Sequence, residues 1–148
     1  MASTTDPLQF AKNIRARGME VRKHARLLVQ QAALRCDQVV VLETPVDTGR
    51  ARAGWVASVN DPIFHDPGEG RSSGFSEPQA NATFLSMEAA KIAIATYGLD
   101  DHSIWITNVV PYIGELNFGS AVHEPGEMMQ HGVLAAAQVI RDGKLLKP

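Results

Sequence analysis

A long stretch without helix-breaking residues constrains this fold more than any other feature of the sequence. After Pro7 there is no proline until Pro45 and only one glycine, Gly18; most positions hold Ala, Leu, Arg, Gln, Lys or Val, which apart from valine favour helices. Asp6 fits the start, because an acidic cap followed by proline is a common helix opening. The run predicts one helix over about residues 7–43, because Pro45 disfavours helical geometry at the residue before it.

This helix is too long for the domain that 148 residues can build. It would run roughly 50 Å at 1.5 Å per residue, whereas a domain of this size has a radius of gyration near 15 Å, by the usual scaling with chain length. The helix must therefore bend or project. A narrow apolar stripe runs along it, formed by Ile14, Gly18, Val21, Ala25, Leu28, Ala32 and Val39. Since small residues allow a close neighbour, Gly18, Ala25 and Ala32 are predicted at a contact between subunits.

The rest of the chain predicts a small sheet with helices against it. Alternating or β-branched residues indicate two strands, and helical spacing indicates further helices. A stretch rich in Gly, Pro and Ser over about residues 60–81 predicts a long loop. We expect strands at 54–59 and 103–108, helices at 82–96 and 125–141, and a short helix at 111–118. The fold class is α+β: one domain over residues 1–148, with a small, mostly antiparallel sheet and two main helices besides the long one.

Charge is distributed unevenly along the chain. Residues 1–52 hold nine basic and five acidic side chains, a net of +4, and residues 53–148 hold five basic and eleven acidic ones, a net of −6. Opposite poles favour head-to-tail self-association; ordinary scatter of charge over a solvated helix is the alternative. No apolar run approaches the roughly 18 residues of a membrane helix. The single cysteine, Cys36, cannot form an intrachain disulfide, so a reducing cytoplasm is the expected compartment.

Three chemical alternatives arise from local patterns. Asp47-Thr48-Gly49 matches the triplet of aspartic proteases, whose chemistry needs two carboxylates, so this chain would have to dimerise to supply the second. The arginines that follow would hold Asp47 ionised, which favours a structural turn instead. The basic helix could contact DNA phosphates, although no aromatic residues accompany its charges. Histidines and acids near the last helix do not have the spacing of a zinc site; they are His123, Glu124, Glu127 and His131. We expect no metal and no cofactor.

Two segments resemble motifs of one protein family. Thr44–Trp55 reads TPVDTGRARAGW, and Ile106–Ser120 reads ITNVVPYIGELNFGS. In this order and spacing they resemble the neck or tail-completion (putative tail-component) family of long-tailed bacteriophages, whose members have a long N-terminal helix before the first motif and a strand after it. The residues that carry the resemblance are Pro45, Asp47, Thr48, Gly49, Arg52, Trp55, Asn108, Pro111, Tyr112 and Gly119.

The resemblance implies a structural virion protein and no enzyme. It implies a ring of identical subunits, sixfold in number, that terminates the tail or joins it to the head. The implied partners are head connector proteins and the tail tube protein, and the implied place of assembly is the host cytoplasm. Passing contact of the basic helix with packaged DNA is compatible with this role. A minor tail protein near the tube is the alternative within phages. In the ring, Arg50 and Arg52 are expected to face a neighbour's acids: Asp61, Asp66, Glu69, Asp100 and Asp101.

The residues of the motifs also have expected structural roles. Pro45 ends the long helix, Asp47 and Gly49 form a turn, and Trp55 anchors the sheet. In the second motif, Tyr112 and Phe118 are expected to pack inward. Nothing in these segments activates a nucleophile or a water molecule.

Overall fold

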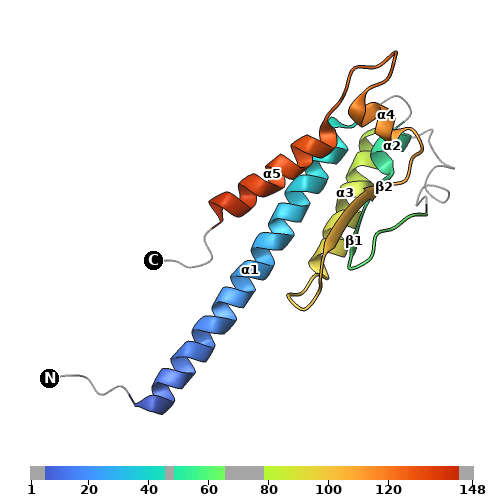
Figure 1. Cartoon of the computed structure of the whole chain (residues 1–148). Helices are drawn as coiled ribbons and strands as arrows, with labels where there is room; N and C mark the ends of the chain where they lie inside the picture. The colour runs from blue at the N-terminus through green and yellow to red at the C-terminus, as the bar shows by residue number, and fades with distance from the viewer. Residues whose placement is uncertain (1–5, 46–48, 66–78, 144–148) are drawn as a thin grey trace.

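The computed structural model describes residues 6–45, 49–65 and 79–143. It confirms the predicted α+β class, with a long N-terminal helix and a two-stranded antiparallel sheet (Figure 1). The elements in chain order are α1 (Pro7–Glu43), α2 (Arg50–Ala53), β1 (Trp55–Val59), α3 (Gln79–Ala95), β2 (Ile104–Asn108), α4 (Ile113–Phe118) and α5 (Met128–Asp142).

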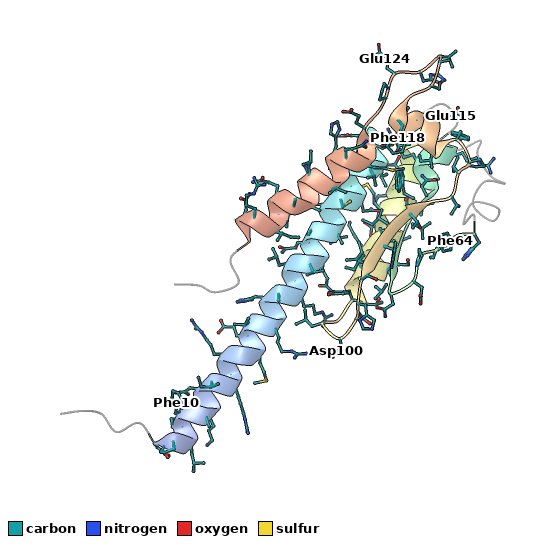
Figure 2. The ribbon with its side chains drawn as sticks, in the orientation of Figure 1. Phe10, Phe64, Asp100, Glu115, Phe118 and Glu124 are labelled. Atoms are coloured by element: carbon teal, nitrogen blue, oxygen red, sulfur yellow. The ribbon has the colours of Figure 1, made fainter. Side chains whose placement is uncertain are left out.

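Helix α1 projects well beyond the rest of the molecule. It has 37 residues, which corresponds to about 55 Å. Its start is capped as expected, because the backbone N–H of Leu8 donates to the Asp6 carboxylate at 3.1 Å. Every residue from position 6 to position 20 is exposed, and Phe10 lies near the free end, far from the body (Figure 2). The structure thus confirms a projecting helix.

Helix α3 and the sheet cover one side of α1. The strands pair from Trp55 opposite Asn108 to Val59 opposite Ile104. Helix α3 contacts both α1 and β1. Its last carbonyl groups are capped from α1, where the Gln30 amide donates to Ile94 at 3.2 Å. Apolar side chains fill the space between these elements, and Ala57, Ala90 and Ile94 are buried there.

Helix α5 covers another face of α1 and runs antiparallel to it (Figure 1). At one end, a Cβ placed on Gly132 would lie 2.7 Å from Val40 and 3.1 Å from the Cys36 sulfur; at the other, a Cβ on Gly143 would clash with the Leu28 side chain. The two helices therefore approach closely over the C-terminal half of α1. Beyond Leu28, towards the N-terminus, α5 no longer covers α1.

Several boundaries differ from the expectations. Helix α3 begins at Gln79, so the loop expected over 60–81 is shorter; residues 66–78 of it lie outside the described residues. Helix α2 was not predicted, and α4 and α5 begin at Ile113 and Met128 rather than at 111 and 125. Each of these differences concerns a segment that is short or flanked by proline, where the periodic spacing of apolar residues gives little information about the helix ends.

The expectation that Tyr112 and Phe118 pack inward is wrong. Tyr112 is exposed and Phe118 is 66% exposed. Helix α4 buries Ile113 and Asn117, which are one turn apart, so the neighbouring positions 112 and 118 are rotated towards the solvent.

Two glycine substitutions should change stability in opposite directions. Gly132→Ala should destabilise the protein by about 1–3 kcal/mol, because the new methyl group overpacks the contact with Val40 and Cys36. Gly18→Ala is the matched control: nothing lies within 4 Å of its Cβ position, so better helix propensity should stabilise by about 0.5–1 kcal/mol. Urea unfolding of both variants measures the difference, and equal effects would contradict the close α1–α5 packing.

Candidate functional site

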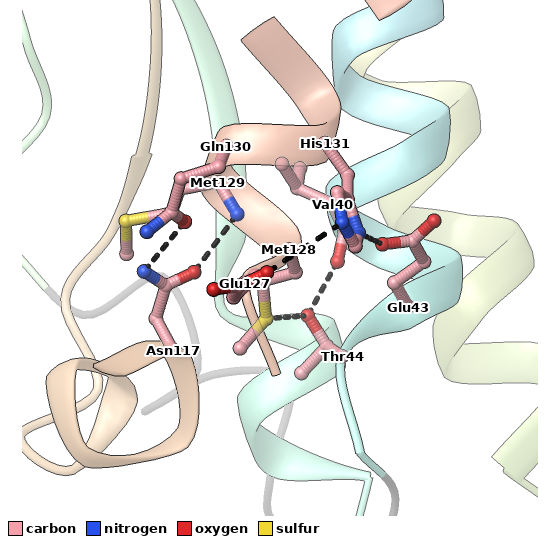
Figure 3. Close-up of polar contacts among 9 residues, drawn as sticks. All are labelled: Val40, Glu43, Thr44, Asn117, Glu127, Met128, Met129, Gln130 and His131. Carbon is pink, nitrogen blue, oxygen red and sulfur yellow. Dashed lines mark hydrogen bonds and ion pairs between the residues drawn. The ribbon is translucent and has the colours of Figure 1, made fainter. Parts of the chain in front are cut away.

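The C-terminal end of α1 is the point where the first motif is anchored. The Thr44 hydroxyl is buried and donates to the Val40 carbonyl, while the Trp55 indole N–H donates to the same hydroxyl at 2.8 Å. The sulfur of Met128, the first residue of α5, lies 3.1 Å from this oxygen. Figure 3 shows Thr44 between Val40 and Met128. Trp55 is buried at the start of β1, as expected, so a single hydroxyl connects α1, β1 and α5.

Arg52 caps the same end of α1. Its guanidinium group donates to the carbonyls of Leu42 and Thr44, both at 2.9 Å. The last carbonyls of a helix have no partner within the helix, and a cation near them is favourable. Arg52 therefore caps α1 within its own subunit, and its expected contact with a neighbour's acids stays a prediction.

The second motif packs directly on the first. The Asn108 side-chain amide donates to the Ala51 carbonyl at 2.7 Å, and its oxygen accepts from the Val110 N–H at 3.0 Å. A Cβ on Gly54 would lie 2.8 Å from both the Asn108 oxygen and Val110, so only glycine fits here without a shift. The two motifs that lie far apart in sequence thus form one contiguous scaffold.

Asn117 was not among the predicted site residues, yet it organises the start of α5 (Figure 3). It is fully buried. Its oxygen accepts from the Met129 N–H at 2.9 Å, and its amide donates to the Gln130 side chain at 2.9 Å. Its backbone carbonyl accepts from the Glu127 N–H at 3.0 Å. Asparagine is a common capping residue, but it lies 11 residues before α5, so sequence spacing could not link the two.

The remaining motif residues have varied surroundings. Gly49 is buried and has a φ of +79°, a left-handed conformation that favours glycine. Gly119 has a φ of +84° and packs against Pro125. Pro45, Arg50 and Pro111 are exposed. The other two motif residues, Asp47 and Thr48, lie outside the described residues, as do Asp66 and Glu69 of the expected acidic face.

The predicted inter-subunit stripe divides into two parts. Gly18 is exposed, with no neighbour near its Cβ position, and Ala25 is half-buried. Ala32 is only 5% exposed, because α3, the sheet and α5 cover this half of α1 within the same subunit. The expectation that Ala32 meets another subunit is therefore wrong, and a free stripe is left only on the N-terminal half of α1.

Two ionisable groups are perturbed by burial on α1. Burial raises the pKa of the Asp37 carboxyl group from 3.8 to about 7, and one of its oxygens has no hydrogen-bond partner among the described residues. Burial also raises the pKa of the Cys36 thiol, with a smaller contribution from Asp37. A thiol with a raised pKa is a poor nucleophile.

The histidine near the start of α5 lies beside two carboxylates on the surface. The His131 Nδ1 atom lies 2.6 Å from the Glu43 carboxylate, and its Nε2 atom lies 4.0 Å from Glu127, one helical turn earlier. Both contacts are exposed, so they add little to stability. Within residues 6–45, 49–65 and 79–143, no three His, Cys, Asp or Glu residues are grouped closely enough to hold a metal ion.

Comparisons with protein-family models, with curated proteins and with solved structures found no match. Among the described helices, none has an apolar stretch of the length that a membrane crossing requires.

An apolar cavity of about 360 Å³ opens between α1, α5 and the sheet. Cys36, Trp55, Ile106 and Met129 form part of its wall, and the exposed side chains of Phe64 and Val133 flank it. No ionised side chain lines the cavity, so its described lining offers shape and apolar surface rather than acid–base chemistry.

Proposed function

We propose that this protein is a structural subunit of a bacteriophage neck, which assembles with copies of itself into a ring that terminates the tail or joins it to the head. The observation that carries the proposal is the arrangement of the motif residues. Thr44, Arg52 and Trp55 hold the end of α1, while Asn108 fastens the second motif to the first. The motifs thus fix the direction of a helix that projects from the body.

The projecting helix supports a role in assembly. A helix gains most of its stability in water from packing of an apolar face, yet the first half of α1 exposes Leu8, Phe10, Ile14 and Met19. Such a surface on a projecting arm is suited to contact with another chain. In the proposed neck the partners are identical subunits, the head connector and the tail tube protein, and the basic arm can contact packaged DNA in passing.

Electron microscopy of the purified full-length protein tests this proposal. We expect closed rings with a central channel, with sixfold symmetry as the resemblance to neck proteins implies. Particles that are only monomeric, or open filaments without rings, would contradict it. Asp47→Asn serves as the control for the hydrolase alternative: a peptidase activity of the native protein that this variant loses would replace the structural role with a catalytic one.

A further inference from the structure

The free half of α1 is a basic arm with an apolar face. Residues 7–26, called the arm below, hold six basic side chains and one acidic one, a net of +5. Among the described residues, its last turns contact the body: Arg22 pairs with Asp100 at 3.3 Å, and Arg26 donates to the Ala95 carbonyl at 3.4 Å. Val21 is half-buried, and every residue from position 20 back to position 6 is exposed.

The apolar face of the arm continues the face that α5 covers. Leu28 meets Gly143 near the end of α5. Steps of three and four residues back along the helix lead from Leu28 through Val21 and Gly18 to Ile14, all on one face. The same kind of surface that packs a helix within the subunit is therefore exposed on the arm, where α5 has ended.

Charge decides which surface can cover the arm. Two arms packed on each other would bring together two segments of net +5, whereas residues 27–148 carry eight basic and fourteen acidic side chains, a net of −6. Complementary charges favour correct pairing, and like charges oppose it. The arm therefore fits the body of a second copy and not another arm, which makes the contact heterologous.

The outer face of α3 is the acceptor that best fits an arm of this charge. Phe84, Leu85 and Ile92 are exposed on α3, opposite the buried Ser86, Ala90 and Ile94. Glu88 lies one turn from both Phe84 and Ile92, so the charge within this apolar stripe is negative, although Glu88 also pairs with Lys91. Helix α5 exposes Val133, Leu134 and Ile140, but Arg141 next to them is positive.

We propose that the arm of one subunit packs against the outer face of α3 in the next subunit, with Ile14 and Ile92 in the contact. This pairing rests on the proposed ring function and names its interface. Because donor and acceptor are different surfaces of one chain, each copy can give an arm to one neighbour and receive an arm from the other. Such a chain of contacts forms a ring when the rotation from each copy to the next adds up to a full turn.

Sedimentation of full-length variants tests this pairing. Ile14 and Ile92 are 58% and 72% exposed, so Ile14→Glu and Ile92→Glu should fold normally, which thermal unfolding checks. Each variant should weaken self-association at least about tenfold, because a charge would be buried in the contact. Leu134→Glu is the matched control, since Leu134 is 66% exposed on α5, and it should assemble like the native protein.

Mixing the two variants gives the sharper result. The Ile92→Glu subunit keeps an intact arm and the Ile14→Glu subunit keeps an intact acceptor, so a mixture should form dimers and nothing larger. The pairing would be overturned if the mixture formed no dimer, or if Leu134→Glu disrupted self-association and the other two variants did not. Either result would leave the proposed ring assembly standing. If the native protein stayed monomeric, both the pairing and the ring function would be overturned. If the variants behaved as predicted but the native protein formed open filaments, only the ring function would be overturned.

Discussion

Asp37→Asn is expected to stabilise the protein at pH 8 and to leave it almost unchanged near pH 4. Asp37 is 1% exposed, and one of its carboxylate oxygens has no hydrogen-bond partner among the described residues. A buried charge without a partner is costly, and the group avoids that cost by keeping its proton. This is why burial raises the pKa of Asp37 to about 7 in the folded protein.

The sign of the pH dependence follows from the two pKa values. Below pH 3.8 Asp37 is protonated in both states, and its contribution to stability is fully present. As the pH rises, the unfolded chain loses the proton first, and the folded protein keeps it until about pH 7. Stability is therefore lost between about pH 4 and 7, by up to about 4 kcal/mol for a shift of this size.

Urea unfolding at pH 4.5 and pH 8 measures this effect. At pH 8 the native protein should be less stable than Asp37→Asn by about 1–3 kcal/mol, because an unpaired amide costs less to bury than a charge. Asp61→Asn makes the same change at an exposed position and should alter stability by less than about 0.5 kcal/mol at either pH. Parallel pH profiles of the native protein and Asp37→Asn would show that Asp37 is not buried as described.

Asn117→Ala is expected to destabilise the protein by about 2–3 kcal/mol. The substitution removes the acceptor of the Met129 N–H and the donor to Gln130. Losing a helix-capping side chain costs about 0.5–2 kcal/mol, and a buried polar group left unpaired costs about 1–3 kcal/mol. Since α5 covers α1, hydrogen exchange should accelerate in the first turn of α5 before it does so elsewhere.

Asn13→Ala is the matched control for Asn117→Ala. Asn13 is exposed on the arm, and its side chain accepts a hydrogen bond from Gln9 one turn earlier. Removing it should change stability by at most about 0.5 kcal/mol. Similar effects of the two alanine substitutions would mean that Asn117 does not hold the start of α5.

The long helix was predictable from sequence because its signals are local. Asp6, Pro7 and Pro45 mark its ends, and a continuous run of helix formers lies between them. Trp55 as an anchor of the sheet was also predictable, since a large aromatic residue at the start of a strand is usually buried. These features depend on nearby residues, and the structure confirms them.

Burial on α1 was not predictable, because it depends on which elements pack against the helix. The stripe from Ile14 to Val39 reads as one surface in the sequence, but α3, the sheet and α5 cover only its second half, and Ala32 is inside the subunit. Asp37 lies on the covered half of the same helix and is 1% exposed, which its neighbours in sequence do not indicate. The sequence positions of α3, the sheet and α5 do not show which face of α1 these elements will cover.

The caps formed across the fold were hidden for the same reason. Arg52 donates to carbonyls of α1, and Asn117 holds the start of α5. Each bond joins residues that no fixed spacing relates, so only the assembled fold shows it. The error at Tyr112 and Phe118 has a different cause: a helix of six residues is too short for its apolar pattern to fix its orientation.

The most direct test of a neck function is electron microscopy of phage particles made when this chain carries an early stop codon. A ring that terminates the tail or joins it to the head is required only at the last stage of assembly. We therefore predict filled heads and separate tails that do not join, or tails of irregular length, with joined particles restored when the intact chain is supplied. Normal, infectious particles in the absence of the chain would contradict the proposed function.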